Sequence, residues 1–282
     1  MKRTYLLLII LFLFYFSKAE ENDKTLSIVI LSAPKKRPEL TKTIKDLSIA
    51  LENVPKGLKV TEIVFMKGCI HGCNHKEMDD GVQLMKEKFP NIKITVPNIK
   101  PKESDGIGNE PWTYDNFSSL WLRSVPLSDI WDYDLFKKYM IVNFYFRKGL
   151  EYVYSNSTAD YVLMSEDDQT YRQDTFHTVL ELMNINNPKR LMSKIAWCQD
   201  VDCYHRGMKN NFTADCKTDF IWGAWGVMRS RKELGIFLRW MKFSNFTESE
   251  DTLGSFLCTY LEGNVETKHV SRHFGRLYSI PD

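Results

Sequence analysis

The sequence predicts an α/β fold, with one domain built on a mostly parallel, twisted sheet that is flanked by helices. In the first third of the chain, apolar strand candidates alternate with helical patterns, which is typical of parallel strands joined by crossover helices. Hydrophobic residues make up 43% of the chain, so a sizeable core can form. A later apolar strand candidate runs into three acidic residues, and open α/β sheets bind ligands at the carboxyl ends of their strands.

The first strand candidate is Leu26–Leu31, an uninterrupted apolar run rich in β-branched residues, as expected of a strand buried on both faces. Leucine and isoleucine then recur at spacings of three and four residues from Leu40 to Leu51, which predicts a helix. The next predicted elements are a strand at Lys59–Met66, a helix at Asp79–Phe89 and a strand at Ile92–Val96. Residues 97–116 are polar and rich in Pro and Gly, so we expect a long loop.

In the second half, Tyr133–Tyr154 carries apolar residues around most of a helical circumference, which predicts a buried helix. A strand is expected at Tyr161–Met164, before the acidic residues. Asp174 suits the N-cap of a following helix, because a carboxylate can accept hydrogen bonds from the free backbone amides there. The remaining expected elements are a strand at Ser193–Cys198, an apolar stretch at Phe220–Met228, and helices at Lys232–Lys242 and Leu253–Leu261.

The N-terminus has the pattern of a secretory signal peptide. Two basic residues precede Thr4–Phe16, an apolar run of 13 residues, and small residues at Ser17 and Ala19 suit a cleavage site. Spanning a bilayer takes about 20 residues, so this shorter run favours a cleaved signal peptide. An uncleaved signal anchor attached to the membrane is the alternative. We therefore expect a signal peptide at residues 1–19 and one domain at residues 20–282, located in the lumen of the Golgi or ER, with secretion as the alternative.

The cysteines support the same location. Six follow the signal segment: Cys69, Cys73, Cys198, Cys203, Cys216 and Cys258. An even number in an oxidising lumen predicts disulfide bonds, whose pairing the sequence does not determine. The segment Cys69–His75 superficially resembles a zinc site, but its spacing matches no common zinc pattern, so we favour a disulfide.

Two further features concern partners. Sequons for N-glycosylation begin at Asn116, Asn156, Asn211 and Asn245, as in a secretory glycoprotein. The net charge of +2 gives no electrostatic reason to expect a nucleic acid as partner.

The acidic residues Glu166, Asp167 and Asp168 are the most informative candidates for chemistry. Three adjacent carboxylates repel one another, and a divalent cation relieves that repulsion because magnesium, calcium and manganese prefer oxygen ligands. Asp168 and Asp167 are the expected metal ligands, since strand alternation turns one inward and the turn can direct the other. The alternative interpretation is a solvated acidic turn.

Three other places could contribute. Pro34–Arg37 follows the first strand, where backbone amides and basic side chains often face a phosphate, although an ordinary turn gives the same pattern. Glu250 and Asp251 precede an apolar helix, where they could cap the helix or act as a general base. His273 matters only if the fold carries it back to the acidic residues.

Taken in this order, the motifs resemble those of the N-acetylglucosaminyltransferase IV family, inverting glycosyltransferases of the GT-A fold that use nucleotide sugars and are related to the alpha-1,3-mannosyl-glycoprotein beta-N-acetylglucosaminyltransferases. The matching segments are Pro34–Arg37, Tyr161–Asp168, Phe176, Asp251–Cys258 and His273–Ser279. The chain departs from the family where Tyr278 replaces the first residue of a final Ser-Ser. The resemblance implies a Rossmann-like sheet in a single GT-A-like domain.

The resemblance also implies roles for these residues. Asp168, Asp167 and His273 would hold Mn²⁺ or Mg²⁺, which acts as a Lewis acid on the diphosphate of a UDP-sugar donor. The donor site would be formed by Pro34, Lys35, Arg37, Glu166 and Asp167. Asp251, or else Glu250, would serve as the base that accepts the proton of the attacking hydroxyl.

The expected reaction is transfer of a sugar, N-acetylglucosamine by resemblance, to a glycan or glycolipid acceptor, with N-glycans as the family's precedent. Two alternatives stay open. One is a catalytically inactive, secreted domain of the same fold that binds carbohydrate or protein. The other is a structural domain in which calcium occupies the acidic residues.

Overall fold

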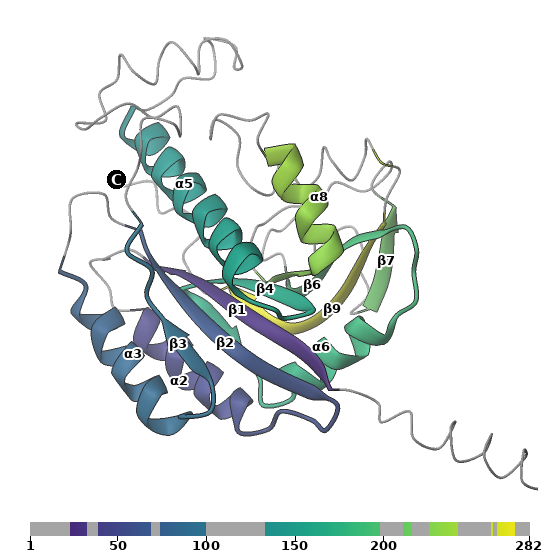
Figure 1. Ribbon diagram of the computed structural model, residues 1–282, viewed down its shortest axis with the longest axis horizontal. Helices are drawn as coiled ribbons and strands as arrows, with labels where there is room; N and C mark the ends of the chain where they lie inside the picture. Colours follow the sequence, from purple (N-terminus) through teal and green to yellow (C-terminus); the bar gives the residue numbers. More distant parts are fainter. Residues whose placement is uncertain are drawn as a thin grey trace, which may run out of the picture.

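The computed structural model (Figure 1) describes residues 23–32, 39–68, 74–99, 133–197, 211–215, 226–241, 261 and 264–273. For residues 133–143, 196–197, 211–215 and 264–273, only the course of the backbone is described. The strands are β1 (Lys24–Ser32), β2 (Leu58–Lys67), β3 (Lys93–Thr95), β4 (Tyr161–Glu166), β5 (Gln169–Tyr171), β6 (Arg190–Trp197), β7 (Asn211–Asp215), β8 (Val227–Ser230) and β9 (Asn264–His273). The helices are α2 (Leu40–Leu51), α3 (Lys76–Lys88), α5 (Tyr133–Asn156), α6 (Thr175–Asn184) and α8 (Arg231–Met241).

The described strands form one nine-stranded sheet in the order β3-β2-β1-β4-β8-β6-β9-β5, with β7 paired to β9. From β1 the chain moves outward through β2 to β3, and it then returns to the other side of β1 with β4. All pairings among these four strands are parallel, as predicted. The strand order therefore reverses between β1 and β4, which makes this position the topological switch point of the sheet.

The other half of the sheet differs from the prediction of a mostly parallel sheet. β8 is antiparallel to both β4 and β6, and β9 is antiparallel to β5 and β7, while β6 and β9 are parallel. Four of the eight described pairings are thus antiparallel, and the sheet is mixed. The alternation of strands and crossover helices that led to the prediction is confined to the N-terminal half.

Helices cover both faces of the sheet (Figure 1). Along β1, Leu26, Ile28 and Ile30 belong to a core shared with α2, α3 and α6. The alternate residues Val29 and Leu31 belong to a second core shared with α5 and α8. This alternation explains the uninterrupted apolar sequence of β1, because both of its faces are buried, and burying each such side chain contributes about 1.5–3 kcal/mol.

Gly149 lets α5 approach the sheet closely. A Cβ atom at this position would lie 2.8 Å from Met66 Cγ and 3.1 Å from Val29 Cγ1. Distances this short are too small for carbon atoms in contact, so a larger residue would push the helix away from β1 and β2. The glycine therefore fixes the spacing between α5 and the two strands beneath it.

The predicted helices and strands up to β4 are confirmed within a few residues, but the prediction for Asp174 is wrong in detail. Asp174 occupies the N-cap position of α6 without a side-chain capping hydrogen bond. Its Oδ2 instead accepts a hydrogen bond of 2.7 Å from Nη2 of Arg172. The Asp174 carboxylate therefore pairs with the Arg172 guanidinium and not with the backbone amides at the start of α6.

Several predictions concern residues that the structure does not describe. They include the signal segment, all six cysteines, most of the loop 97–116, and nearly all of the helix at Leu253–Leu261. Within the described part of the chain, none of the helices combines the length and apolarity needed to cross a bilayer.

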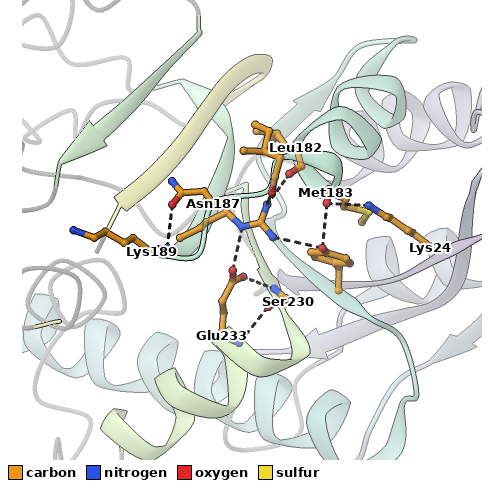
Figure 2. A network of polar contacts seen from close by, with 10 residues as sticks. Lys24, Leu182, Met183, Asn187, Lys189, Ser230 and Glu233 are labelled. Atoms are coloured by element: carbon orange, nitrogen blue, oxygen red, sulfur yellow. Dashed lines mark hydrogen bonds and ion pairs between the residues drawn. The ribbon is translucent and has the colours of Figure 1, made fainter. Parts of the chain in front are cut away.

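A network of paired charges lies at the amino edge of the sheet, where β1, β4 and β6 begin (Figure 2). Nε of Arg190 lies 3.0 Å from Oε1 of Glu233, and both side chains are about nine-tenths buried. Burial lowers the pKa of Arg190, but the ion pair with Glu233 outweighs this effect and the net shift is upward. Arg190 also donates to the backbone oxygen of Leu182 at 2.7 Å.

The network extends to both neighbouring elements. Glu233 and Ser230 form a reciprocal capping box at the start of α8, with the Ser230 amide 2.6 Å from Oε2 of Glu233. Tyr161 Oη and Lys24 Nζ both donate to the backbone oxygen of Met183, at 3.2 and 2.9 Å. The C-terminal end of α6, the starts of three strands and the start of α8 are thereby joined.

Candidate functional site

The acidic residues lie at the carboxyl edge of the sheet, at the switch point. β1 and β4 run parallel, and Leu31 pairs with Glu166, the last residue of β4. Asp167 and Asp168 form the turn that leads from β4 into β5. Because ligands of open α/β sheets bind at the switch point, this turn occupies the position where a ligand is expected.

The carboxylates of the turn are buried. Asp167 is 5% exposed and Asp168 is 6% exposed, while Glu166 is half-buried. The alternative of a solvated acidic turn is therefore wrong for the two aspartates. Burial of adjacent like charges opposes folding, so the arrangement calls for a cation or for strong hydrogen-bond donors.

Asp167 is held by hydroxyl groups from two other elements. Ser32 Oγ, at the end of β1, donates to Oδ2 of Asp167 at 2.8 Å. Thr43 Oγ1, in the first turn of α2, donates to the backbone oxygen of Asp167 at 2.8 Å. The side chain and the backbone of Asp167 are thus fixed by separate contacts.

His75, which directly precedes α3, extends this contact. Its Nε2 lies 2.8 Å from Ser32 Oγ, and the imidazole is 3% exposed. Burial lowers the pKa of His75, against the smaller opposing effects of Glu77 and Asp167. The order of groups is His75, Ser32, Asp167, with the serine in the middle and 1% exposed, so this is not the arrangement of a hydrolytic triad, in which histidine lies between the other two.

A second buried network fixes the strands on either side of the turn. Ser165 Oγ donates to Oε1 of Gln169 at 2.8 Å and accepts a hydrogen bond from the hydroxyl of Tyr171. Burial raises the pKa of Tyr171 far above its ordinary value, so its hydroxyl remains a donor. Since Ser165 precedes the acidic residues and Gln169 follows them, the network clamps the two ends of the turn together.

The backbone brings His273 back to the acidic turn. In the antiparallel pairing of β5 with β9, His273 lies opposite Gln169, the residue that follows Asp168. His273 was expected to matter only if the fold carried it back to the acidic residues, and its backbone lies beside them. Its side chain is outside the described part of the structure. The strand that carries it, β9, was not predicted.

The residues present fit a divalent cation bound together with a phosphate. Asp168 makes other contacts, but its Oδ1 atom is buried and accepts no hydrogen bond from the residues described. Among the described side chains no group of three His, Cys, Asp or Glu residues converges. Magnesium-like ions are commonly held by one or two carboxylates plus substrate phosphates, so Asp167 and Asp168 suffice for this mode of binding.

The other predicted site residues cannot be placed in the site. Pro34, Lys35 and Arg37, and likewise Glu250 and Asp251, lie outside the described residues. Pro34 is the second residue after Ser32, which ends β1 at the switch point.

Sequence reasoning missed Ser32, Thr43 and His75. A usable signal was present for two of them. Ser32 ends the first strand and His75 follows the second, and the carboxyl ends of adjacent parallel strands meet at one edge of a sheet. His75 had been considered only as part of a cysteine-rich cluster.

The fold is similar to those of S. aureus TarS and of the galactosyltransferase LgtC, the latter solved in complex with donor and acceptor sugar analogues. TarS 1-349 matches with 10% identity over 88% of this chain and 60% of that chain, with a TM-score of 0.48. LgtC matches with 11% identity over 86% of this chain and 72% of that chain, with a TM-score of 0.43. The longer TarS structure gives a TM-score of 0.49, and the chain spans 36% of its length.

No protein-family model matches the chain, and no curated protein sequence matches it either. At 10–11% identity and TM-scores below 0.5, the structural likeness does not assign an activity to the chain. The function is therefore argued from the chain's own residues.

Proposed function

We propose that the protein is a metal-dependent, inverting glycosyltransferase of the GT-A type that moves a sugar from a UDP-sugar to a hydroxyl group of a glycan or glycoconjugate. The observation that carries the proposal is the burial of Asp167 and Asp168 side by side at the switch point of the sheet. Such burial opposes folding, a bound cation would offset it, and this is the place where α/β sheets bind ligands. The resemblance in sequence motifs favours N-acetylglucosamine as the transferred sugar.

In this proposal Asp167 and Asp168, together with His273, hold Mn²⁺ or Mg²⁺. When bound, such an ion neutralises the diphosphate of the donor and makes it a better leaving group. The chain's contribution is to fix the ligands. Ser32 and Thr43 hold Asp167 by its side chain and backbone, and the Ser165 network holds both ends of the turn.

The donor's nucleotide and phosphates are assigned to residues that follow the switch-point strands. Pro34, Lys35 and Arg37 follow β1, and the basic side chains of Lys35 and Arg37 suit a negatively charged diphosphate. Glu166, at the end of β4, is half-buried beside Leu31 and completes the proposed donor site.

The acceptor hydroxyl needs a base, because its pKa lies far above neutrality. Asp251 is the proposed base and Glu250 the alternative, each taking the proton as the hydroxyl oxygen attacks the anomeric carbon opposite the leaving diphosphate. Attack from that side inverts the configuration. We further propose that the protein works in the lumen of the Golgi or ER, with a glycan or glycolipid as acceptor.

The experiment is a transfer assay that measures UDP release from a panel of UDP-sugars, with manganese and N-glycan or glycolipid acceptors. Asp251→Asn should lower turnover by about 10²–10⁴-fold, because a general base contributes that much, while UDP binding is retained. The matched control is Asp80→Asn on the exposed side of α3, which should leave turnover unchanged. UDP binding without transfer from any donor would favour an inactive binding domain instead.

A further inference from the structure

A buried chain of three side chains leads from the acidic turn into the interior of the carboxyl edge. Asp167 Oδ2, Ser32 Oγ and His75 Nε2 are joined by two contacts of 2.8 Å each. All three residues are at least 95% buried. They come from three separate parts of the chain, namely the turn after β4, the end of β1 and the residue before α3.

The number of hydrogens on these three side chains sets the direction of both hydrogen bonds. A serine hydroxyl has one hydrogen, and Ser32 donates it to Asp167. The contact between Ser32 and His75 then requires His75 Nε2–H as the donor. Nε2 carries a hydrogen in the imidazolium and in one neutral tautomer, so this direction does not depend on the protonation state of His75.

We infer that Ser32 and His75 are positioning residues for Asp167, with His75 orienting the Ser32 hydroxyl so that its hydrogen points at Asp167 Oδ2. The hydrogen bond to Oδ2 thereby fixes the plane of the carboxyl group that would hold the cation of the donor complex. This inference rests on the proposed function, because it concerns how the same site holds its metal.

Both residues stand one or two contacts away from the proposed cation. Ser32 contacts the Asp167 carboxylate, His75 contacts Ser32, and both are buried. Hydrogen-bonding partners of metal ligands typically contribute 10–100-fold to metal affinity. We therefore expect Ser32 and His75 to act on metal binding, through Asp167.

The test uses the full chain and measures UDP binding by calorimetry as a function of manganese concentration. In Ser32→Ala and His75→Leu, the manganese concentration that gives half-maximal UDP binding should rise by about 10–100-fold. His75→Gln should restore binding to near the wild-type value, because the Gln amide nitrogen can supply a hydrogen in place of Nε2–H. This rescue distinguishes positioning from simple filling of the space, and it also serves if His75→Leu does not fold.

Two matched controls are available in the same structure. Ser27 lies on β1 and is as buried as Ser32, but its hydroxyl contacts Ser157 at 2.7 Å instead of the acidic turn. His177 is exposed on α6. Ser27→Ala and His177→Leu should both keep the wild-type manganese dependence.

The outcomes separate this inference from the proposed function. Wild-type protein without manganese-dependent UDP binding would overturn both. Normal binding by the wild type, with unchanged manganese dependence in folded Ser32→Ala and in His75→Leu or His75→Gln, would overturn the positioning role alone. Failure of His75→Gln to restore the loss seen in His75→Leu would also contradict it.

Discussion

At the amino edge of the sheet, the buried guanidinium of Arg190 lies 3.0 Å from Glu233 and also donates to a backbone oxygen, so opposite charges offset each other within the chain. At the carboxyl edge, the turn after β4 buries Asp167 and Asp168 as adjacent like charges, and the described contacts of Asp167 come from hydroxyl groups. In the first arrangement the chain itself supplies the charge that compensates the buried guanidinium. In the second arrangement, we propose that a bound cation supplies the compensating positive charge.

The difference follows from the direction of the strands. β1, β4 and β6 all begin at the edge that holds the ion pair, and β1 and β4 end where the acidic turn lies. The fold thus separates an edge that holds a charge-paired network from the edge at which we propose that a ligand binds. Substitutions at the amino edge should change the free energy of unfolding, while those at the carboxyl edge should change ligand affinity.

The largest expected loss of stability is from Arg190→Ala. Removing one partner of a buried ion pair leaves the carboxylate of Glu233 uncompensated, which typically costs about 3–5 kcal/mol. Chemical denaturation would measure this loss. The matched control is Arg172→Ala, since the pair of Arg172 with Asp174 is exposed and should contribute at most about 1 kcal/mol. Equal losses of unfolding free energy in the two variants would contradict the larger role assigned to the buried pair of Arg190 and Glu233.

A smaller effect is expected from Ser230→Ala, which removes half of the capping box of α8. The Glu233 amide donates to Ser230 Oγ at 3.2 Å, and loss of such a cap costs about 0.5–2 kcal/mol. The comparison is with Ser155→Ala, an exposed position near the end of α5. Thermal unfolding of both variants gives the difference, and a Ser155→Ala loss as large as that of Ser230→Ala would argue against the cap.

The smallest effect is expected from Lys24→Met. Lys24 Nζ donates to the backbone oxygen of Met183 at 2.9 Å, but the group is only partly buried. Such a contact should contribute less than about 1 kcal/mol. A loss comparable to that of Arg190→Ala would show that the edge depends on Lys24 far more than its exposure indicates.

Local sequence patterns predicted the N-terminal half of the fold well. The apolar run of β1 and the leucine spacing of α2 are dictated by burial against neighbouring layers, and burial leaves a readable periodicity. β5 has three residues, and β9 is largely polar, so neither carries such a signal. Both exist because they pair with each other and, for β9, with β6 and β7.

The candidate site was predicted in part for a related reason. Asp167 and Asp168 could be recognised from residue type and from their position after an apolar strand. The contributions of Ser32 and His75 depend on three segments meeting at one edge, and the signal for this is the parallel order of the strands and no local pattern. Asp174 shows the opposite error, because a local rule predicted the N-cap position correctly but also a capping hydrogen bond, and the carboxylate pairs with Arg172 instead.

The central claim is that the acidic turn binds a metal together with a nucleotide, and calorimetric titration of UDP with and without manganese tests it most directly. Asp168→Asn and Asp160→Asn form a matched pair, since one aspartate follows β4 and the other precedes it at the amino edge, where it accepts hydrogen bonds from Thr25. The account predicts manganese-dependent UDP binding in the wild type and in Asp160→Asn, with a loss of at least about tenfold in Asp168→Asn. Absence of UDP binding in folded wild-type protein, or unchanged binding in Asp168→Asn, would contradict it.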